Sequence, residues 1–183
     1  QYNNALYQEW LATSIPSATV PQAPSQTTPT EPGSSGNSGN NGGSDAPANN
    51  NSADEGWKVP IKYVANTSPF GERDQPTAGA STNHKGVDLA APEGTAIGAA
   101  KSGTVLVAEY NPSAGYYVVI EHDNGYRSVY MHMSSFDVKP GQTVSQGQQI
   151  GACGSTGVST GSHLHFGISQ NGVYKNPADY IPV

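Results

Sequence analysis

From residue 57 onward, short apolar runs alternate with turn-forming residues, and no window keeps the 3.6-residue apolar period of a helix. The runs are rich in β-branched and aromatic residues, which favour strands. They include GTVLVAEY, GYYVVIEH, GYRSVYMHM, QTVSQGQQIGACG and SHLHFGIS. Between the runs, NPSAG, HDNG, KPGQ and QNG carry the Gly, Pro and Asn residues that hairpin turns need. The pattern predicts an all-β domain over residues 57–183, built as a compact antiparallel β-sandwich.

In the middle of this domain, from EGTAIGAAKSGTVLVAE to KPGQTVSQGQQIGACG, glycines recur between short expected strands. The same spacing of glycines is typical of the β-sandwich of lipoyl and biotinyl carrier domains. We therefore expect a lipoyl- or biotinyl-like core. A carrier function is a poor interpretation, because such a domain needs a lysine at its exposed hairpin, commonly between two methionines. In the segment MHM of this chain, His132 occupies that position.

The first third of the chain has a different composition. Residues 1–14 could form a short helix with Leu6 and Trp10 on one face, used to dock onto an upstream domain or another chain, or could be a frayed tail. Residues 15–56 are first Pro/Thr/Ser-rich and then Gly/Asn/Ser-rich, with almost nothing to bury. We predict a disordered linker there, preceding the folded domain.

Charge and cysteine content exclude several classes of function. The chain has 183 residues and a formal net charge of -6, which gives no electrostatic basis for binding nucleic acid or an anionic membrane surface. No apolar run is long enough to cross a bilayer, and no secretory signal peptide is recognisable. The single cysteine, Cys153, cannot form an internal disulfide. We expect no nucleic acid and no membrane among the partners.

Histidines and one aspartate carry the candidate chemistry. In HLH, His163 and His165 lie two apart on an expected strand, so both project from one face. In NHKGVDLAAP, His84 and Asp88 lie four apart, and Gly86 with the β-branched residue after it favours extended chain. His84, Asp88 and one histidine of HLH would offer zinc two nitrogens and one oxygen and leave a fourth position for water. Such an open ligand set is typical of catalytic zinc.

Two further histidines have different expected roles. In SVYMHMSSF, strict alternation would place Tyr130 and His132 on one face, opposite Val129, Met131 and Met133. A histidine between two methionines is most simply a packed core residue. With the other site residues already identified, we prefer a catalytic role for His132. His122, at the entrance of the turn HDNG, is interpreted as structural.

These segments resemble the lysostaphin-type (LytM-domain) zinc endopeptidases, which cut peptidoglycan peptides. The resemblance covers about residues 69–180 and includes SPFGERDQP, HKGVDLAAPEGTAI, YMHM, VKPGQTVSQGQQIGACGSTGVSTGSHLHFGI and NPADY, in the order of the family. It implies that His84, Asp88 and His165 hold one zinc ion and that His132 and His163 are the catalytic histidines. The chain departs from the family by lacking a tyrosine that some members carry shortly before the first ligand.

Arg73 and Tyr130 are the substrate-binding candidates. Arg73 in FGER matches a recurrent arginine of the family and could bind a substrate carboxylate, although a solvated loop charge is an equally good interpretation. Either residue could replace the hydrogen bond of the missing tyrosine. We expect the segments at residues 67–83 and 109–117 to set specificity.

The resemblance implies a zinc endopeptidase that hydrolyses cross-bridge or stem peptides of bacterial peptidoglycan, outside the cell. The alternative is a non-catalytic LytM-like module that binds wall peptide or activates a partner hydrolase. Such modules lack zinc ligands, whereas all five site residues occur here. A secreted or cell-surface bacterial enzyme and an antimicrobial lysin of a phage tail both suit the composition. The linker over residues 15–56 slightly favours the phage tail, because it would let an enzyme bound to the particle reach the wall. In that setting, residues 1–14 would contact other phage tail proteins.

Overall fold

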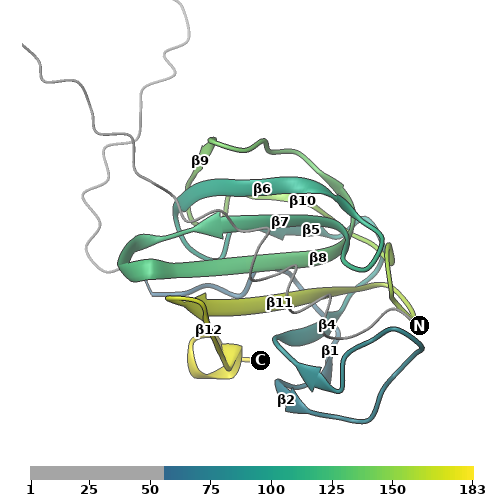
Figure 1. Cartoon of the computed structure of the whole chain (residues 1–183). Helices are drawn as coiled ribbons and strands as arrows, with labels where there is room; N and C mark the ends of the chain where they lie inside the picture. The colour runs from purple at the N-terminus through teal and green to yellow at the C-terminus, as the bar shows by residue number, and fades with distance from the viewer. Residues whose placement is uncertain (1–55) are drawn as a thin grey trace, which may run out of the picture. The chain divides into compact units, whose positions relative to one another are not determined.

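The structure, a computed structural model, describes residues 56–183, and almost every regular element in that range is a strand (Figure 1). The strands are β1 (Ala65–Ser68), β2 (Gly71–Glu72), β3 (Asn83–His84), β4 (Val87–Ala90), β5 (Ala96–Gly98), β6 (Gly103–Asn111), β7 (Gly115–Glu121), β8 (Tyr126–Phe136), β9 (Thr143–Val144), β10 (Gln149–Cys153), β11 (His163–Gln170) and β12 (Val173–Lys175). Two short 3-10 segments, η1 (Asp123–Gly125) and η2 (Pro177–Asp179), complete the described elements. Neither is long and apolar enough to cross a membrane. The all-β prediction is confirmed.

The N-terminal predictions cannot be compared with this structure. The helix expected over residues 1–14 lies outside the described residues, as does the linker expected over residues 15–56 apart from Gly56.

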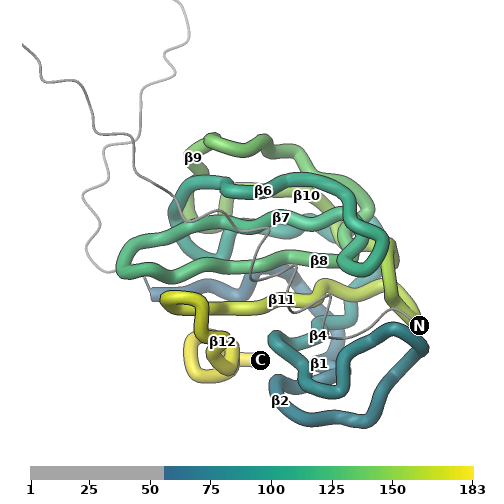
Figure 2. The backbone as a smooth tube through the Cα atoms, viewed as in Figure 1, coloured from purple at the N-terminus to yellow at the C-terminus, as the bar shows by residue number. Residues whose placement is uncertain are grey.

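The strands pair antiparallel throughout the main sheet, in the order β1-β4-β11-β8-β7-β6-β9. β12 pairs with β11, β10 pairs with β5 and β8, and β2 and β3 form a separate small ladder. Figure 2 shows β11 running between β8 and β4, so the last long strand lies inside the sheet. This places the segment HLH beside the segment that carries Asp88.

β8 joins two layers of the domain. Its first part pairs with β7 and β11, whereas its last residues pair with β10, which also pairs with β5. The main apolar core gathers buried side chains from these strands, among them Leu89, Ile97, Ile150, Leu164 and Phe166. Burying each such side chain contributes roughly 1.5–3 kcal/mol. The arrangement confirms the predicted sandwich.

The hairpin turns fall where the sequence predicts them. NPSAG connects β6 to β7, HDNG connects β7 to β8, and QNG connects β11 to β12. Asn124 and Asn171 have φ angles of 59° and 50°, a left-handed conformation that asparagine tolerates better than most residues.

A bulge in β8 contradicts the strict alternation expected for SVYMHMSSF. Tyr116 pairs with Met133 and Val118 pairs with Tyr130, so β8 has one residue more than β7 between these pairs. His132 takes the left-handed conformation at this point, with φ 64°. As a result Tyr130 and Met133 both face the main core, and the prediction that Tyr130 shares a face with His132 is wrong.

His122 has the structural role expected for it. Its Nδ1 donates to the carbonyl oxygen of Ser102 (2.9 Å), so its Nε2 accepts from the hydroxyl of Ser128 (2.7 Å). The Ser128 oxygen lies 2.9 Å from the Tyr130 hydroxyl, which also accepts from the N–H of Ala100 (2.8 Å). These bonds satisfy polar groups inside the core, where an unpaired group costs about 1–3 kcal/mol.

Acid should destabilise the domain partly through His122. Burial is the main cause that lowers the pKa of His122 from 6.5 to about 4, so between these values the unfolded chain binds more protons. The stability contributed by neutral His122 is complete above pH 6.5 and is lost as the pH falls toward 4, by up to about 3 kcal/mol. We expect the free energy of unfolding, measured with urea on metal-free protein, to fall less between neutral and acidic pH in His122→Gln than in wild type. Equal falls would contradict this assignment.

Candidate metal centre and active site

His163 and His165 project from β11 on the side opposite its core residues. Leu164 and Phe166 are fully buried in the main core, so the alternation of the strand turns both imidazoles to the other face. In the sheet, His165 pairs directly with Asp88 of β4 and with Met131 of β8. The register therefore brings the pair of histidines to Asp88 and to the bulge that carries His132.

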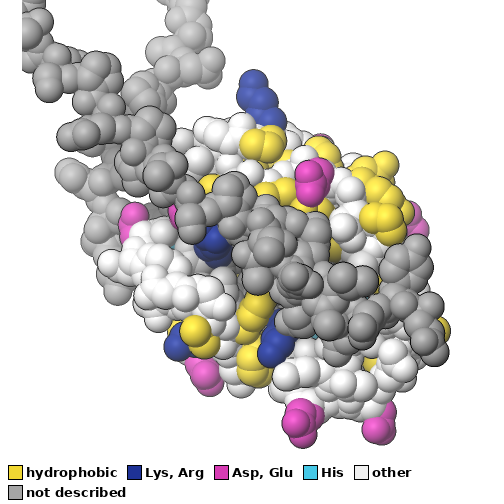
Figure 3. All heavy atoms as spheres, in the orientation of Figure 1, with side chains coloured by type: hydrophobic (Ala, Val, Ile, Leu, Met, Phe, Trp, Pro, Cys, Tyr) yellow, Lys and Arg dark blue, Asp and Glu magenta, His cyan; other side chains and the backbone are white. Residues whose placement is uncertain are grey.

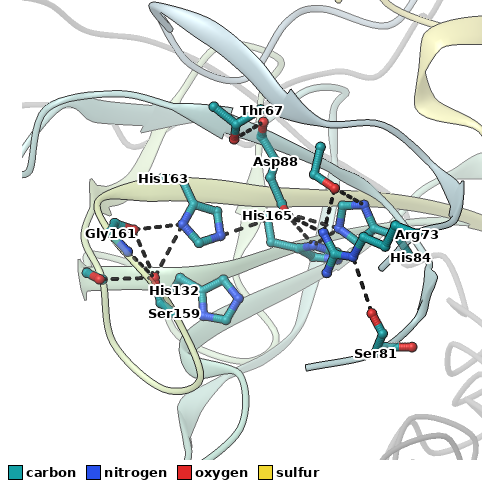
Figure 4. Close-up of polar contacts among 12 residues, drawn as sticks. Thr67, Arg73, Ser81, His84, Asp88, His132, Ser159, Gly161, His163 and His165 are labelled. Atoms are coloured by element: carbon teal, nitrogen blue, oxygen red, sulfur yellow. Dashed lines mark hydrogen bonds and ion pairs between the residues drawn. The ribbon is translucent and has the colours of Figure 1, made fainter. Parts of the chain in front are cut away.

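His84, Asp88 and His165 converge on one point (Figure 4). His84 Nε2 lies 3.0 Å from Asp88 Oδ1, His165 Nδ1 lies 2.9 Å from the same oxygen, and the two nitrogens are 2.9 Å apart. All three residues are buried. β3 and β4 supply His84 and Asp88 as extended chain on either side of Gly86. A Cβ on Gly86 would lie 2.4 Å from the carbonyl oxygen of Phe166, so only glycine fits there.

The three side chains fit a divalent metal ion. His84 Nδ1 donates to the carbonyl oxygen of Pro69 (2.8 Å), which leaves its Nε2 with a lone pair facing His165 and Asp88. Two nitrogens and one carboxylate oxygen turned toward each other are the donor set that zinc accepts. Ligands of a tetrahedral zinc lie about 3.3 Å from one another, close to the separations found here.

Arg73 holds the other oxygen of Asp88. Its Nη1 lies 2.8 Å from Asp88 Oδ2 and donates to the Ser68 hydroxyl (2.6 Å), while its Nε donates to the carbonyl oxygen of Ser81 (3.2 Å). Thr67 donates its hydroxyl to the backbone oxygen of Asp88 (3.1 Å). These contacts fix the carboxylate so that Oδ1 points at the two histidines, in the way that outer partners orient metal ligands.

His132 and His163 lie beside this cluster with their rings 4.8 Å apart (Figure 4). His132 Nδ1 contacts the carbonyl oxygen of Thr156 (2.8 Å), and His163 Nδ1 contacts the carbonyl oxygen of Gly161 (2.8 Å). A carbonyl only accepts, so Nδ1 carries the proton in both rings and Nε2 is the nitrogen that can take up a proton. His163 Nε2 lies 3.7 Å from Asp88 Oδ1, so this nitrogen faces the metal ligands.

Burial sets the charge of these groups. It is the main cause that lowers the pKa of His132 to about 3 and also lowers the pKa of His165. Burial alone would raise the pKa of Asp88, but hydrogen bonds and charge interactions with His165 and His84 hold it well below its ordinary value. These shifts favour an ionised Asp88 and a neutral His165, the protonation states in which both side chains can bind a metal.

An open groove runs over the cluster. Its lining comes mainly from two segments, residues 67–80 and 158–163, and includes Asp88, His132, His163 and His165. An adjoining hollow is lined by Ser113 of the β6–β7 turn and by residues 79–85. The first expected specificity segment, residues 67–83, thus lines the groove, whereas the second, residues 109–117, lines the adjoining hollow through Ser113. The loop before β11 was not anticipated as part of the groove.

The two substrate-binding candidates are placed differently. Tyr130 is fully buried and its hydroxyl is engaged inside the core, so the prediction that it contacts substrate is wrong. The bulge at His132 is the reason, since it separates the two residues onto different faces. Arg73 lines the groove but contacts Asp88 and Ser68, so it is not the solvated loop charge of the alternative interpretation. A contact between Arg73 and substrate stays a prediction.

Sequence reasoning missed several contacts of the site. Ser159 places its hydroxyl 3.3 Å from His163 Nδ1, Thr156 holds His132, and Ser68 supports Arg73. The segment GSTGVSTGS carries a signal that could have found two of them, because it directly precedes HLH and must lie near it.

Charged side chains are scattered over the visible surface. In Figure 3, the acidic and basic side chains on the face shown lie singly, without a continuous patch of either sign.

Comparison with known proteins agrees with this site. Peptidase family M23 matches residues 82–177, just over half of the chain. ShyC of Vibrio cholerae serotype O1, named a peptidoglycan DD-endopeptidase, is 43% identical over 121 residues, covering 66% of this chain and 28% of ShyC. The chain thus spans little more than a quarter of that relative.

Two solved structures share the fold. A zinc-containing peptidase from Vibrio cholerae has a TM-score of 0.62 at 36% identity, over 67% of this chain and 39% of the peptidase. The catalytic domain of lysostaphin from Staphylococcus simulans has a TM-score of 0.56 at 32% identity, over 66% of this chain and 91% of that domain. The family match covers the whole span from His84 to His165, so this chain belongs to peptidase family M23.

Proposed function

We propose that this domain is a zinc-dependent endopeptidase that hydrolyses peptide bonds in bacterial peptidoglycan. The observation that carries the proposal is the convergence of His84 Nε2, Asp88 Oδ1 and His165 Nδ1 at an open groove, with two more imidazoles beside them. Among residues 56–183, these three form the group of side chains able to hold a metal. Three protein ligands leave a coordination position open, as catalytic zinc requires.

The residues of the site divide the work. His84, Asp88 and His165 would hold the zinc ion, which would supply polarisation of a substrate carbonyl and a water acidic enough to attack near neutral pH. His163 and His132 each offer an unprotonated Nε2, so one can accept a proton from the attacking water and pass it to the leaving amine. The other can donate a hydrogen bond to the developing oxyanion if its Nε2 has first taken a proton from solvent.

The substrate class follows from the relatives. ShyC and ShyB of Vibrio cholerae are named peptidoglycan DD-endopeptidases, and Mpg of Neisseria meningitidis is named a DD-carboxypeptidase/endopeptidase. We extend this to the present chain and propose a DD peptide cross-link as the bond cleaved. The small and hydroxyl-bearing side chains of the groove, such as Thr77, Ala80, Ser159 and Gly161, suit an extended peptide with small side chains.

A digestion of purified walls tests the proposal. Zinc-loaded protein is incubated with DD-cross-linked muropeptide dimers and, separately, with walls bridged by pentaglycine, and new amino termini are identified by mass spectrometry. We expect cleavage of the DD dimer, its loss after chelation and its return with zinc. A zinc-loaded protein that releases nothing from any wall type would instead favour the non-catalytic wall-binding or hydrolase-activating module.

The proposed substrate places the action of the domain in the periplasm or outside the cell. The finer alternatives, a phage tail lysin and a secreted or surface-anchored bacterial enzyme, depend on residues 1–56 and stay predictions of the sequence.

A further inference from the structure

Thr156, in the loop between β10 and β11, joins three segments around His132. Its carbonyl oxygen contacts His132 Nδ1 at 2.8 Å. Its hydroxyl donates to the carbonyl oxygen of Met133 (2.6 Å) and accepts from the backbone N–H of Tyr116 (3.0 Å). One residue therefore connects the β8 bulge, the tip of the β6–β7 hairpin and the imidazole itself.

His132 needs such support because its backbone conformation is unfavourable. A φ of 64° is uncommon for a residue other than glycine and persists only where the surroundings enforce it. The backbone N–H of His132 donates to the carbonyl oxygen of Ala114 (2.9 Å), in the same hairpin tip that Thr156 contacts. The hairpin tip and the loop thus hold the main chain and the ring of His132 from two sides.

The packing around Thr156 leaves little room for its hydroxyl to move. A Cβ added to Gly115 would lie 2.2 Å from Thr156 Oγ1, and one added to Gly157 would lie 2.3 Å from the Gly115 nitrogen. The N–H of Val158 donates to the carbonyl oxygen of Ser113 (2.9 Å), which fastens the loop to the hairpin a second time. The close approach of two glycines fixes the position of Thr156 relative to β7.

We propose that Thr156 is a positioning residue for His132. Its hydroxyl fixes the peptide unit whose carbonyl oxygen orients the imidazole, so that Nδ1 keeps its proton and Nε2 is presented to the groove. The inference rests on the proposed function, since it gives Thr156 a part in the work of His132. Thr156 is not among the three metal-ligand candidates, so its loss should change turnover and leave metal binding intact.

The test compares Thr156→Ala, which removes the hydroxyl, with Thr156→Ser, which keeps it. On the DD-cross-linked dimer, Thr156→Ala should lower kcat about 10- to 100-fold, because small misplacements of a catalytic group have effects of this size. KM and the zinc dissociation constant, measured by chelator competition, should stay close to wild type, and Thr156→Ser should restore most of kcat. The matched control is Thr95→Ala, whose hydroxyl contacts Pro92 in an exposed turn and which should change nothing.

Wild-type protein supplies an independent readout. The imidazole ¹⁵N chemical shifts of His132 in the full zinc-loaded chain should show the tautomer protonated at Nδ1. In Thr156→Ala, the Nδ1 proton of His132 should exchange with solvent faster than in wild type. The other tautomer would overturn the inference even if no variant folds. Equal kcat for Thr156→Ala and wild type, or equal losses in the alanine and serine variants, would also overturn it. If wild type binds zinc but cleaves nothing, the proposed function fails, while the tautomer still tests the positioning.

Discussion

Replacing Asp88 by asparagine should weaken zinc binding by about 100-fold or more and should lower the hydrolysis of wall peptide with it. Asp88 is the charged member of the ligand set, and its Oδ1 contacts both ligand histidines. Asparagine keeps the shape of the side chain but removes the charge that two imidazoles cannot replace. Loss of a mere outer partner weakens zinc binding about 10- to 100-fold, so loss of the ligand charge should cost about 100-fold or more.

Zinc content by mass spectrometry and a dissociation constant by chelator competition measure this effect without reference to activity. Asp137→Asn is the matched control, because Asp137 is exposed, contacts Gln149 and is not among the residues that line the groove. If Asp88→Asn retained one zinc ion per chain at wild-type affinity, the proposed ligand set would be incorrect.

Replacing His163 by alanine should produce the opposite combination, with zinc retained and turnover lost. His163 lies beside the proposed ligands, with its Nε2 3.7 Å from Asp88 Oδ1. Its Nδ1 is hydrogen-bonded to the carbonyl oxygen of Gly161, which orients the ring. Removing a group that transfers a proton lowers turnover by about 10²- to 10⁴-fold. His132→Ala should behave in the same way, and the double variant should lose less than the product of the two effects, since such groups act as a unit.

Turnover on the DD dimer, paired with zinc content, separates these variants from the Asp88 variant. His122→Gln serves as the control, because His122 is a core histidine whose replacement should lower stability and not the turnover of the folded protein. Loss of zinc from His163→Ala would show that His163 is a ligand and would require a different division of roles.

Much of the fold and the site could be predicted because the signals are local. Side chains alternate between the two faces of a strand, so HLH predicts that His163 and His165 share a face. The turn residues in NPSAG, HDNG and QNG predict the positions of three hairpins. The grouping of His84 and Asp88 with one histidine of HLH follows from ligand chemistry. The choice of His165 as the ligand came from the family resemblance. In the structure, His165 pairs directly with Asp88 in the sheet.

The parts that failed depend on contacts between distant segments. The bulge that turns His132 away from Tyr130 lies where β8 passes from pairing with β7 to pairing with β10, and nothing in SVYMHMSSF marks it. The bond between Arg73 and Asp88 joins positions fifteen residues apart, and the bond between Thr156 and Tyr116 joins positions forty residues apart. Alternation and spacing along one segment contain no information about such contacts.

Because His165 pairs with Asp88 in the sheet, the proposed metal site can form only after β11 has paired with β4. These residues are separated by 77 positions, so the cluster forms only after a long-range closure that brings the last long strand into the middle of the sheet. A chain truncated before β11 lacks His165 and therefore lacks one of the three proposed ligands. If the proposed ligand set is correct, metal binding would therefore require β11 to be in place between β4 and β8.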